Sequence, residues 1–190
     1  MGFWKSITQI FKAPLKIITT FLSWLIPQPQ VPDFGDSEFD TYEKGILLNK
    51  QSNDANIPVI YGTRMVGGTR VFMETSGTDN TYLYMAIVLG EGEINDITSI
   101  KIDDKTVTWS GDLADNTQRT VGSGDSNFYK DSASLITVEP HYGTDGQSAS
   151  TLLSTLSSWG STHKLSGLCY LSLRFTWNQD AFQGIPKVQA

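Results

Sequence analysis

The sequence predicts an α+β fold that is mainly β, in which an amphipathic helix precedes a β-barrel or sandwich-like domain carrying one helix of its own. Two observations predict the β part: short apolar runs alternate with polar residues, and glycine or Asp/Asn-rich turns separate these runs. A third observation, an apolar stripe with helical spacing, is confined to the first 26 residues. We therefore divide the chain into a helical segment (1–30), an acidic linker (31–44) and a β-rich domain (45–190).

Composition narrows the possible functions. The chain of 190 residues has a net charge of −6 and an isoelectric point near 4.8, which argues against a basic surface for specific nucleic-acid binding. Residues 1–30 carry +3 and the remainder −9, so the first segment differs in character from the body. The single cysteine, Cys169, excludes an internal disulfide and a cysteine-rich metal site. We expect it to be a small buried residue in a strand.

The first 26 residues carry an apolar stripe with the three- and four-residue steps of an amphipathic helix. Pro14 falls inside this pattern and removes a backbone donor, so we expect two helical pieces or a kink near it. Pro27 and Pro29 then end the helix. Six residues of the stripe are candidate interaction residues that we expect protein to bury: Phe3, Ile7, Phe11, Ile18, Phe21 and Leu25.

Two other interpretations of this segment stay open. A membrane-spanning helix needs about 20 apolar residues, whereas the longest apolar run, Ile17–Ile26, is about half that length and contains hydroxyl side chains. An amphipathic helix could instead lie at a membrane surface. A secretory signal is disfavoured, because Pro27-Gln-Pro-Gln lacks a small-residue cleavage site.

Turn-forming residues divide the rest of the chain into short strands. Thr81–Leu89 is apolar on both faces, so we expect it to be the most buried strand. Ile97–Ile102 and Lys105–Trp109 predict a hairpin with Asp103-Asp104 as its turn. After a turn at Gly143–Gly146, leucines at helical spacing predict a helix at Gln147–Ser157. The other predicted strands are Gly45–Lys50, Ile57–Tyr61, Thr69–Glu74, Arg119–Val121, Leu135–Pro140 and Leu165–Trp177.

Two groups of residues carry a family resemblance. The first runs from Pro58-Val-Ile-Tyr-Gly-Thr-Arg and Gly67-Gly68 to Tyr82-Leu-Tyr-Met-Ala-Ile-Val-Leu and Gly92-Glu93-Ile94. The second contains His141-Tyr-Gly-Thr-Asp-Gly-Gln, His163-Lys-Leu-Ser-Gly, Tyr170-Leu, and Phe182 with Gly184-Ile-Pro-Lys. In this order they resemble the N-terminal region of the lambda-type phage tail-tip protein, the central tail hub or tip attachment protein family. The resemblance covers roughly residues 33–190.

The resemblance implies a structural virion protein at the distal end of a long, non-contractile, siphophage-like tail. Hubs of this family form a trimer that closes the tail tube and links it to the host-recognition parts for attachment and genome ejection. The implied partners are further copies of the chain, the distal tail protein ring, other tail-tip proteins and the tape measure protein, with the host receptor contacted indirectly. The resemblance also implies a hub domain that residues beyond Ala190 complete.

Two other functional classes stay open. A membrane-active tail-tip module would engage the host envelope through residues 1–26 during DNA delivery. An envelope-degrading enzyme would need two carboxylates flanking a cleft, and Glu91 and Glu93 share a face if the strand continues through them. His141 and His163, which we expect in different loops, would bind a metal only if they converged with a carboxylate such as Glu139 or Asp145. No ligand spacing or nucleophile motif supports such sites, so we predict no catalytic residue, metal or cofactor.

Overall fold

The computed structural model describes Asn49 and residues 56–190, which all belong to the compact unit Glu38–Ala190. The predicted N-terminal helix, its break at Pro14 and the acidic linker lie outside these residues. The mainly β fold is confirmed. The described residues form three antiparallel sheets and two single turns of 3-10 helix.

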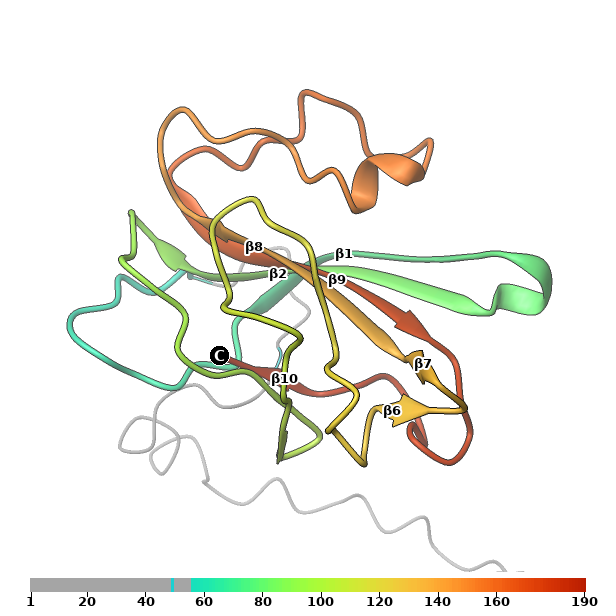
Figure 1. The fold of residues 1–190 in the computed structure, drawn as a ribbon. Helices are drawn as coiled ribbons and strands as arrows, with labels where there is room; N and C mark the ends of the chain where they lie inside the picture. The colour runs from blue at the N-terminus through green and yellow to red at the C-terminus, as the bar shows by residue number, and fades with distance from the viewer. Residues whose placement is uncertain (1–48, 50–55) are drawn as a thin grey trace, which may run out of the picture. The chain divides into compact units, whose positions relative to one another are not determined.

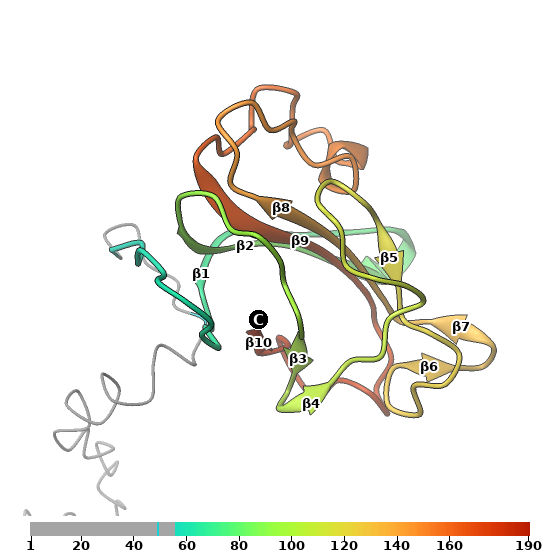
Figure 2. The same ribbon diagram turned by 60° about the vertical axis from the view of Figure 1, so that its left-hand side comes forward.

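The largest sheet has five strands in the order β1-β2-β9-β8-β5, and every neighbouring pair is antiparallel (Figures 1 and 2). In that order the strands are β1 (Thr69–Ser76), β2 (Tyr82–Glu91), β9 (Leu168–Thr176), β8 (Ile136–Tyr142) and β5 (Arg119–Thr120). The three-stranded sheet consists of β10 (Val188–Gln189), β3 (Lys101–Ile102) and β4 (Lys105–Thr106), and a separate hairpin consists of β6 (Tyr129–Lys130) and β7 (Ala133–Ser134). The helical turns are η1 (Thr78–Asn80) and η2 (Leu153–Thr155).

Alternating hydrophobicity predicted most of these strands. The strands β1, β2, β5, β8 and β9 all lie within a few residues of their predicted positions. The predicted hairpin turn is also confirmed, because Asp103 and Asp104 join β3 to β4 with φ values of 49° and 64°. Two consecutive residues with positive φ are what a tight two-residue hairpin turn requires.

The predicted strand Ile57–Tyr61 is wrong. Only Val59 forms a bridge, to Glu91 at the end of β2. Pro58 has no N–H to donate, and its carbonyl instead accepts a 2.9 Å hydrogen bond from the Glu91 amide. Of the predicted strand Gly45–Lys50 only Asn49 is described, and its side chain bonds the backbone N–H and carbonyl of Val188 at 2.6 and 2.9 Å.

The predicted helix at Gln147–Ser157 is also wrong, since that stretch contains only the single turn η2. The amides of Thr151 and Leu152 bond the Glu139 carboxylate, 2.9 and 2.7 Å away, instead of carbonyls of the preceding turn. Hydroxyl side chains compete as well, because Ser150 Oγ accepts a bond from the Leu153 amide. The leucine spacing therefore reflects packing of an irregular segment.

The strands do not close into a barrel. Short runs of backbone hydrogen bonds nevertheless connect the sheets. Ser110 donates to the Thr120 carbonyl at 2.9 Å, which links the segment after β4 to β5. Val66 and Ala190 exchange two hydrogen bonds of 2.8 and 2.9 Å, which link the segment before β1 to the end of β10. The arrangement is a five-stranded sheet with a smaller sheet held against one of its faces.

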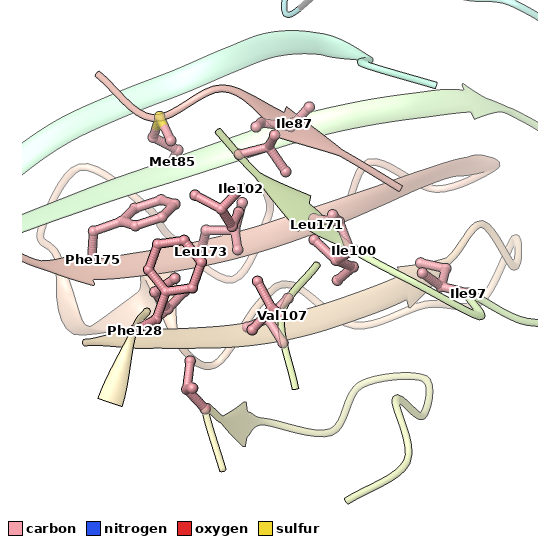
Figure 3. Close-up of a cluster of buried hydrophobic side chains, with 14 of the residues drawn as sticks. Met85, Ile87, Ile97, Ile100, Ile102, Val107, Phe128, Leu171, Leu173 and Phe175 are labelled. Carbon is pink, nitrogen blue, oxygen red and sulfur yellow. The ribbon is translucent and has the colours of Figure 1, made fainter. Parts of the chain in front are cut away.

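The five-stranded sheet is buried on both faces. On the core face, side chains of β2, β9 and β8 meet β3, β10 and the loop segments; Figure 3 shows Met85, Ile87, Leu171, Leu173 and Phe175 gathered with Ile100, Ile102, Val107 and Phe128. On the opposite face the connection Gly143–Gly167, here named the strap, covers the sheet (Figures 1 and 2). The strap face contains Tyr84, Ala86, Val88 and Tyr170 from the sheet, and Leu153, Leu156 and Trp159 from the strap.

The strand β2 is the most buried strand, as predicted, with eight consecutive buried residues. Replacing Val88, which is 1% exposed on the strap face, by Asp places an unpaired charge in the interior. We expect Val88→Asp to lower the free energy of unfolding by about 4 kcal/mol or more. The matched change Val71→Asp on β1, where the side chain is 49% exposed, should cost about 1 kcal/mol or less. Equal losses in denaturant titrations would contradict this core assignment.

Two glycines set the base of the strap. Gly143 has φ +88°, and a Cβ atom there would lie 2.3 Å from the Gly92 carbonyl oxygen. Gly167 has φ +74°, and its carbonyl accepts a 2.8 Å bond from the Gly92 amide. The backbone therefore crosses itself at a point where a side chain at Gly143 does not fit.

Gly143→Ala should consequently destabilise the protein by about 3 kcal/mol or more, because both the backbone angle and the contact with Gly92 become unfavourable. Gly146→Ala is the control, since nothing lies within 4 Å of an added Cβ and its φ is not positive. Its effect should stay within about 0.5 kcal/mol. Thermal unfolding of the two variants distinguishes the outcomes, and a wild-type melting temperature for Gly143→Ala would disprove the crossing.

Candidate interaction surface

The residues that the sequence marked for contact with other chains fall outside the described part of the chain, so their burial stays a prediction. These residues are Phe3, Ile7, Phe11, Ile18, Phe21 and Leu25. The described body offers a different surface. Its features are an open sheet edge, a polar clasp under the strap, and one cavity.

The open edge is β1, because no other strand of the described residues pairs with its outer side. Val71 and Met73 on this strand are 49% and 41% exposed. The β1–β2 hairpin extends past the strap, which leaves the far half of β1 uncovered by it (Figure 1). An open edge with exposed apolar side chains is a surface on which a strand of another chain can pair.

The two edges of the five-stranded sheet differ. At the β5 edge, residues 108–110 run alongside, with Gly122 donating to the Thr108 carbonyl at 2.8 Å and Trp109 bridging Val121. At the β1 edge, a bulge between Arg70 and Phe72 interrupts the register with β2. A bulge bends its strand and limits indiscriminate edge pairing. The open edge is therefore shaped for a specific partner and is only half protected.

A buried carboxylate, Glu139, holds the strap onto the sheet. It points to the strap face from the middle of β8 and is fully buried. The carboxylate accepts bonds from four strap groups, the amides of Thr151 and Leu152 and the hydroxyls of Ser150 and Thr151, at 2.7 to 3.2 Å. Gln118 adds a fifth donor at 3.3 Å. A buried carboxylate is tolerated only when its oxygens are satisfied in this way.

These contacts determine the charge of Glu139. Burial on its own would raise the pKa of Glu139, but neighbouring His141 and the bonds from Thr151 and Leu152 outweigh it and lower the value from 4.5 to about 2. The carboxylate is thus ionised under ordinary conditions. On the same face, burial and then the Glu139 charge raise the pKa of the Tyr170 phenol.

The two histidines do not come together in a metal site. His141 lies within β8 and is fully buried, which corrects its predicted place in a loop. Its Nε2 is 3.4 Å from Glu139 Oε1, and its ring stacks on Tyr170 at 4.1 Å between centroids. His163 is exposed and contacts Trp159 and Gly160 within the strap. Among the described residues no group of three or more His, Cys, Asp or Glu side chains could hold a metal ion.

The carboxylates considered for glycoside hydrolysis are separated by local structure. Glu91 ends β2, and the next residue, Gly92, turns the chain with φ +93°. Glu91 and Glu93 are both exposed. Asp104 lies in the β3–β4 turn and pairs with Lys187 at 3.0 Å. This arrangement is typical of solvated acids at strand ends.

One cavity of about 380 Å³ lies between residues 60–66 and the loop 93–98. Its rim carries Arg64, Glu93 and Asp96, and Asp96 accepts a 3.1 Å bond from the Tyr142 hydroxyl. Burial and then the Asp96 contact raise the pKa of Tyr142 to about 12. Cys169 also borders the cavity but is fully buried, as expected. Its thiol lies 3.3 Å from the Gly90 carbonyl, and burial raises its pKa, so the thiol is unreactive.

Sequence reasoning named Glu139 only as a possible metal partner and missed its role under the strap. One signal was present: Glu139 and His141 lie two apart in the run Ile136–Tyr142, so they share a face of a buried strand. A charged group in such a position needs partners from another segment. Nothing in the sequence identifies that segment as the strap.

No protein-family model and no curated protein sequence matches the chain. In the part of the chain that the structure describes, no helix is long and apolar enough to cross a membrane. The assignment of a function therefore rests on the residues and their arrangement.

The clasp predicts how stability depends on pH. Because the pKa of Glu139 is lowered from 4.5 to about 2, its contribution is complete above pH 4.5 and is lost as the pH falls towards 2. We expect this loss to amount to about 3 kcal/mol. In Glu139→Gln an amide group faces the donors and cannot accept all of them, so the variant should be less stable at pH 7.

Denaturant unfolding of the wild type and Glu139→Gln, followed from pH 7 to pH 2, measures this contribution. The difference in unfolding free energy between the two proteins should shrink as the pH falls below 4.5. The other carboxyl groups titrate equally in both proteins and cancel in the difference. A difference that stays constant with pH would show that the Glu139 charge does not fasten the strap.

Proposed function

We propose that the chain is a structural virion protein, part of the trimeric central hub at the distal tip of a long, non-contractile, siphophage-like tail. In this role it closes the tail tube and connects it to the parts that recognise the host, for attachment and genome ejection. It is made in the host cytoplasm and assembles into the virion. It acts through shape and contact with other chains and not through catalysis.

The observation that carries the proposal is the ordered set of residues resembling the hub family, together with their places in the fold. The Pro58 carbonyl receives the Glu91 amide, and Gly68 packs against the Val88 carbonyl, where an added Cβ would approach to 2.5 Å. Gly92, Gly143 and Gly167 form the crossing at the base of the strap. Residues with these roles specify a fold, which is what a resemblance between structural proteins would preserve.

The later residues of the resemblance have similar roles. The Gln147 side chain accepts from the Gly143 amide at 3.1 Å and donates to the Leu165 and Leu168 carbonyls. Phe182 is buried against Phe128 and Phe175, with ring centroids 5.8 and 5.5 Å away. None of these side chains is directed at the cavity that the described residues enclose.

The surface supports assembly more than chemistry. The open β1 edge, with Val71 and Met73 exposed, suits contact with a neighbouring hub chain or with the distal tail ring. In the proposed tip the remaining partners are other tail-tip proteins and the tape measure protein, and the host receptor is reached indirectly. Contact of residues 1–26 with a membrane remains the alternative role for the N-terminal segment, which lies outside the described residues.

Counting the chain in purified tails tests the proposal. Quantitative mass spectrometry should find three copies of this chain per tail, because a threefold hub closes the tube. The tube protein of the same preparation provides the internal standard, with copies in multiples of six. Six copies of this chain would point to a tube or distal-ring protein, and absence from purified tails would refute a virion role.

A further inference from the structure

The strap is fastened differently from every other part of the five-stranded sheet. Within the described residues, no backbone–backbone hydrogen bond joins residues 145–164 to the rest of the chain. The attachments are made by side chains. Four strap donors bind Glu139, Gln118 donates to Thr151 Oγ1 at 2.9 Å, and Ser158 bonds Glu74 on β1. The strap thus lies on the sheet without being part of its hydrogen-bonded ladder.

The ends of the strap lie close together, as in a hinged loop. The Gly167 amide is 3.4 Å from the Thr144 carbonyl, and the Gly92 amide donates to the Gly167 carbonyl. Gly143 and Gly167 both have positive φ, so the chain enters and leaves the strap through residues with unusual backbone freedom. A loop with joined ends can move as one piece while its base stays in place.

The hydrophobic contacts of the strap also form a group of their own. Leu153, Leu156 and Trp159 pack on Tyr84, Ala86, Val88 and Tyr170, and Trp159 meets Phe72 edge-on at 5.0 Å. The larger cluster on the core face contains no strap residue. Lifting the strap therefore removes one cover of the sheet while the core-face cluster keeps all of its contacts.

Several buried polar atoms would gain hydrogen bonds if the strap lifted. Nδ1 of His141, the Tyr170 hydroxyl, Ser172 Oγ and Trp159 Nε1 have no hydrogen-bond partner among the described residues. By the β8–β9 register, Ser172 lies opposite Glu139 and Tyr170 opposite His141, which places these three on the strap face. Unsatisfied buried groups destabilise the closed state, and water satisfies them when the strap is open.

We infer that the strap is a hinged cover that opens as one unit about its glycine base while the five-stranded sheet and its core face stay folded. Glu139 is the latch, because it receives most of the bonds that hold the strap closed. Opening uncovers an apolar and aromatic platform formed by Tyr84, Val88 and Tyr170. The inference does not depend on the proposed tail-hub function, since it concerns the isolated chain.

Amide hydrogen exchange measured by NMR in the complete chain tests this inference. The reporters are the hydrogen-bonded amides of Thr151, Leu152 and Ser154, compared with Met85 in β2 and Leu173 in β9. All strap reporters should exchange through one common opening, at least about tenfold more often than the sheet amides. Strap amides that exchange only as rarely as Met85 and Leu173 would overturn the inference.

A pair of matched variants locates the latch. Thr151→Val removes a hydroxyl that donates to Glu139 at 3.0 Å and accepts from Gln118, so strap opening should become about tenfold more frequent. Thr155→Val is the control, because the Thr155 hydroxyl bonds only the Leu152 carbonyl inside the strap. The control should change opening less than about twofold. Equal acceleration of strap and sheet amides in Thr151→Val would instead show a single cooperative unit.

Discussion

The central pair of strands, β2 and β9, is apolar on both faces, and the rest of the described structure follows from the need to cover both. A sheet with one solvated face would show polar residues at alternate positions. Here Met85 and Leu173 point to the core face, while Ala86, Val88 and Tyr170 point to the other. The small sheet and its loops cover the first face, and the strap covers the second. An edge-covering segment at β5 completes one side, and β1 is left open.

Covering the second face with an irregular segment creates a polar problem, which Glu139 resolves. The strap does not extend the ladder, so its amides need acceptors, and the carboxylate supplies them from the middle of β8. The cost is a buried charge, which is tolerable only while five donors surround it. The crossing of Gly92, Gly143 and Gly167 supplies the geometry that brings the strap back over the sheet. Shape and electrostatics at this face therefore depend on one another.

The sequence predicted what local patterns encode and missed what depends on distant partners. Alternation identified β1, β2, β8 and β9, and two adjacent aspartates identified the β3–β4 turn. The leucine spacing at Gln147–Ser157 suggested a helix, because nothing local reveals that Glu139 takes the amides of Thr151 and Leu152. Ile57–Tyr61 has strand-like residues, but Pro58 leaves it a single bridge. For the interaction surface, the helical stripe was predicted and the open β1 edge was not, because edges are a property of the assembled sheet.

The proposed role as a tail hub unites the fold-specifying glycines, the open edge and the lack of a convergent catalytic set among the described residues. A reconstruction of the tail tip by electron cryo-microscopy tests this account most directly. It should place three copies of the chain around the tail axis, at the end of the tube, with the β1 edge of each buried against another chain. Density for this chain elsewhere in the particle, or at the tip with the β1 edges of all copies exposed to solvent, would contradict the account.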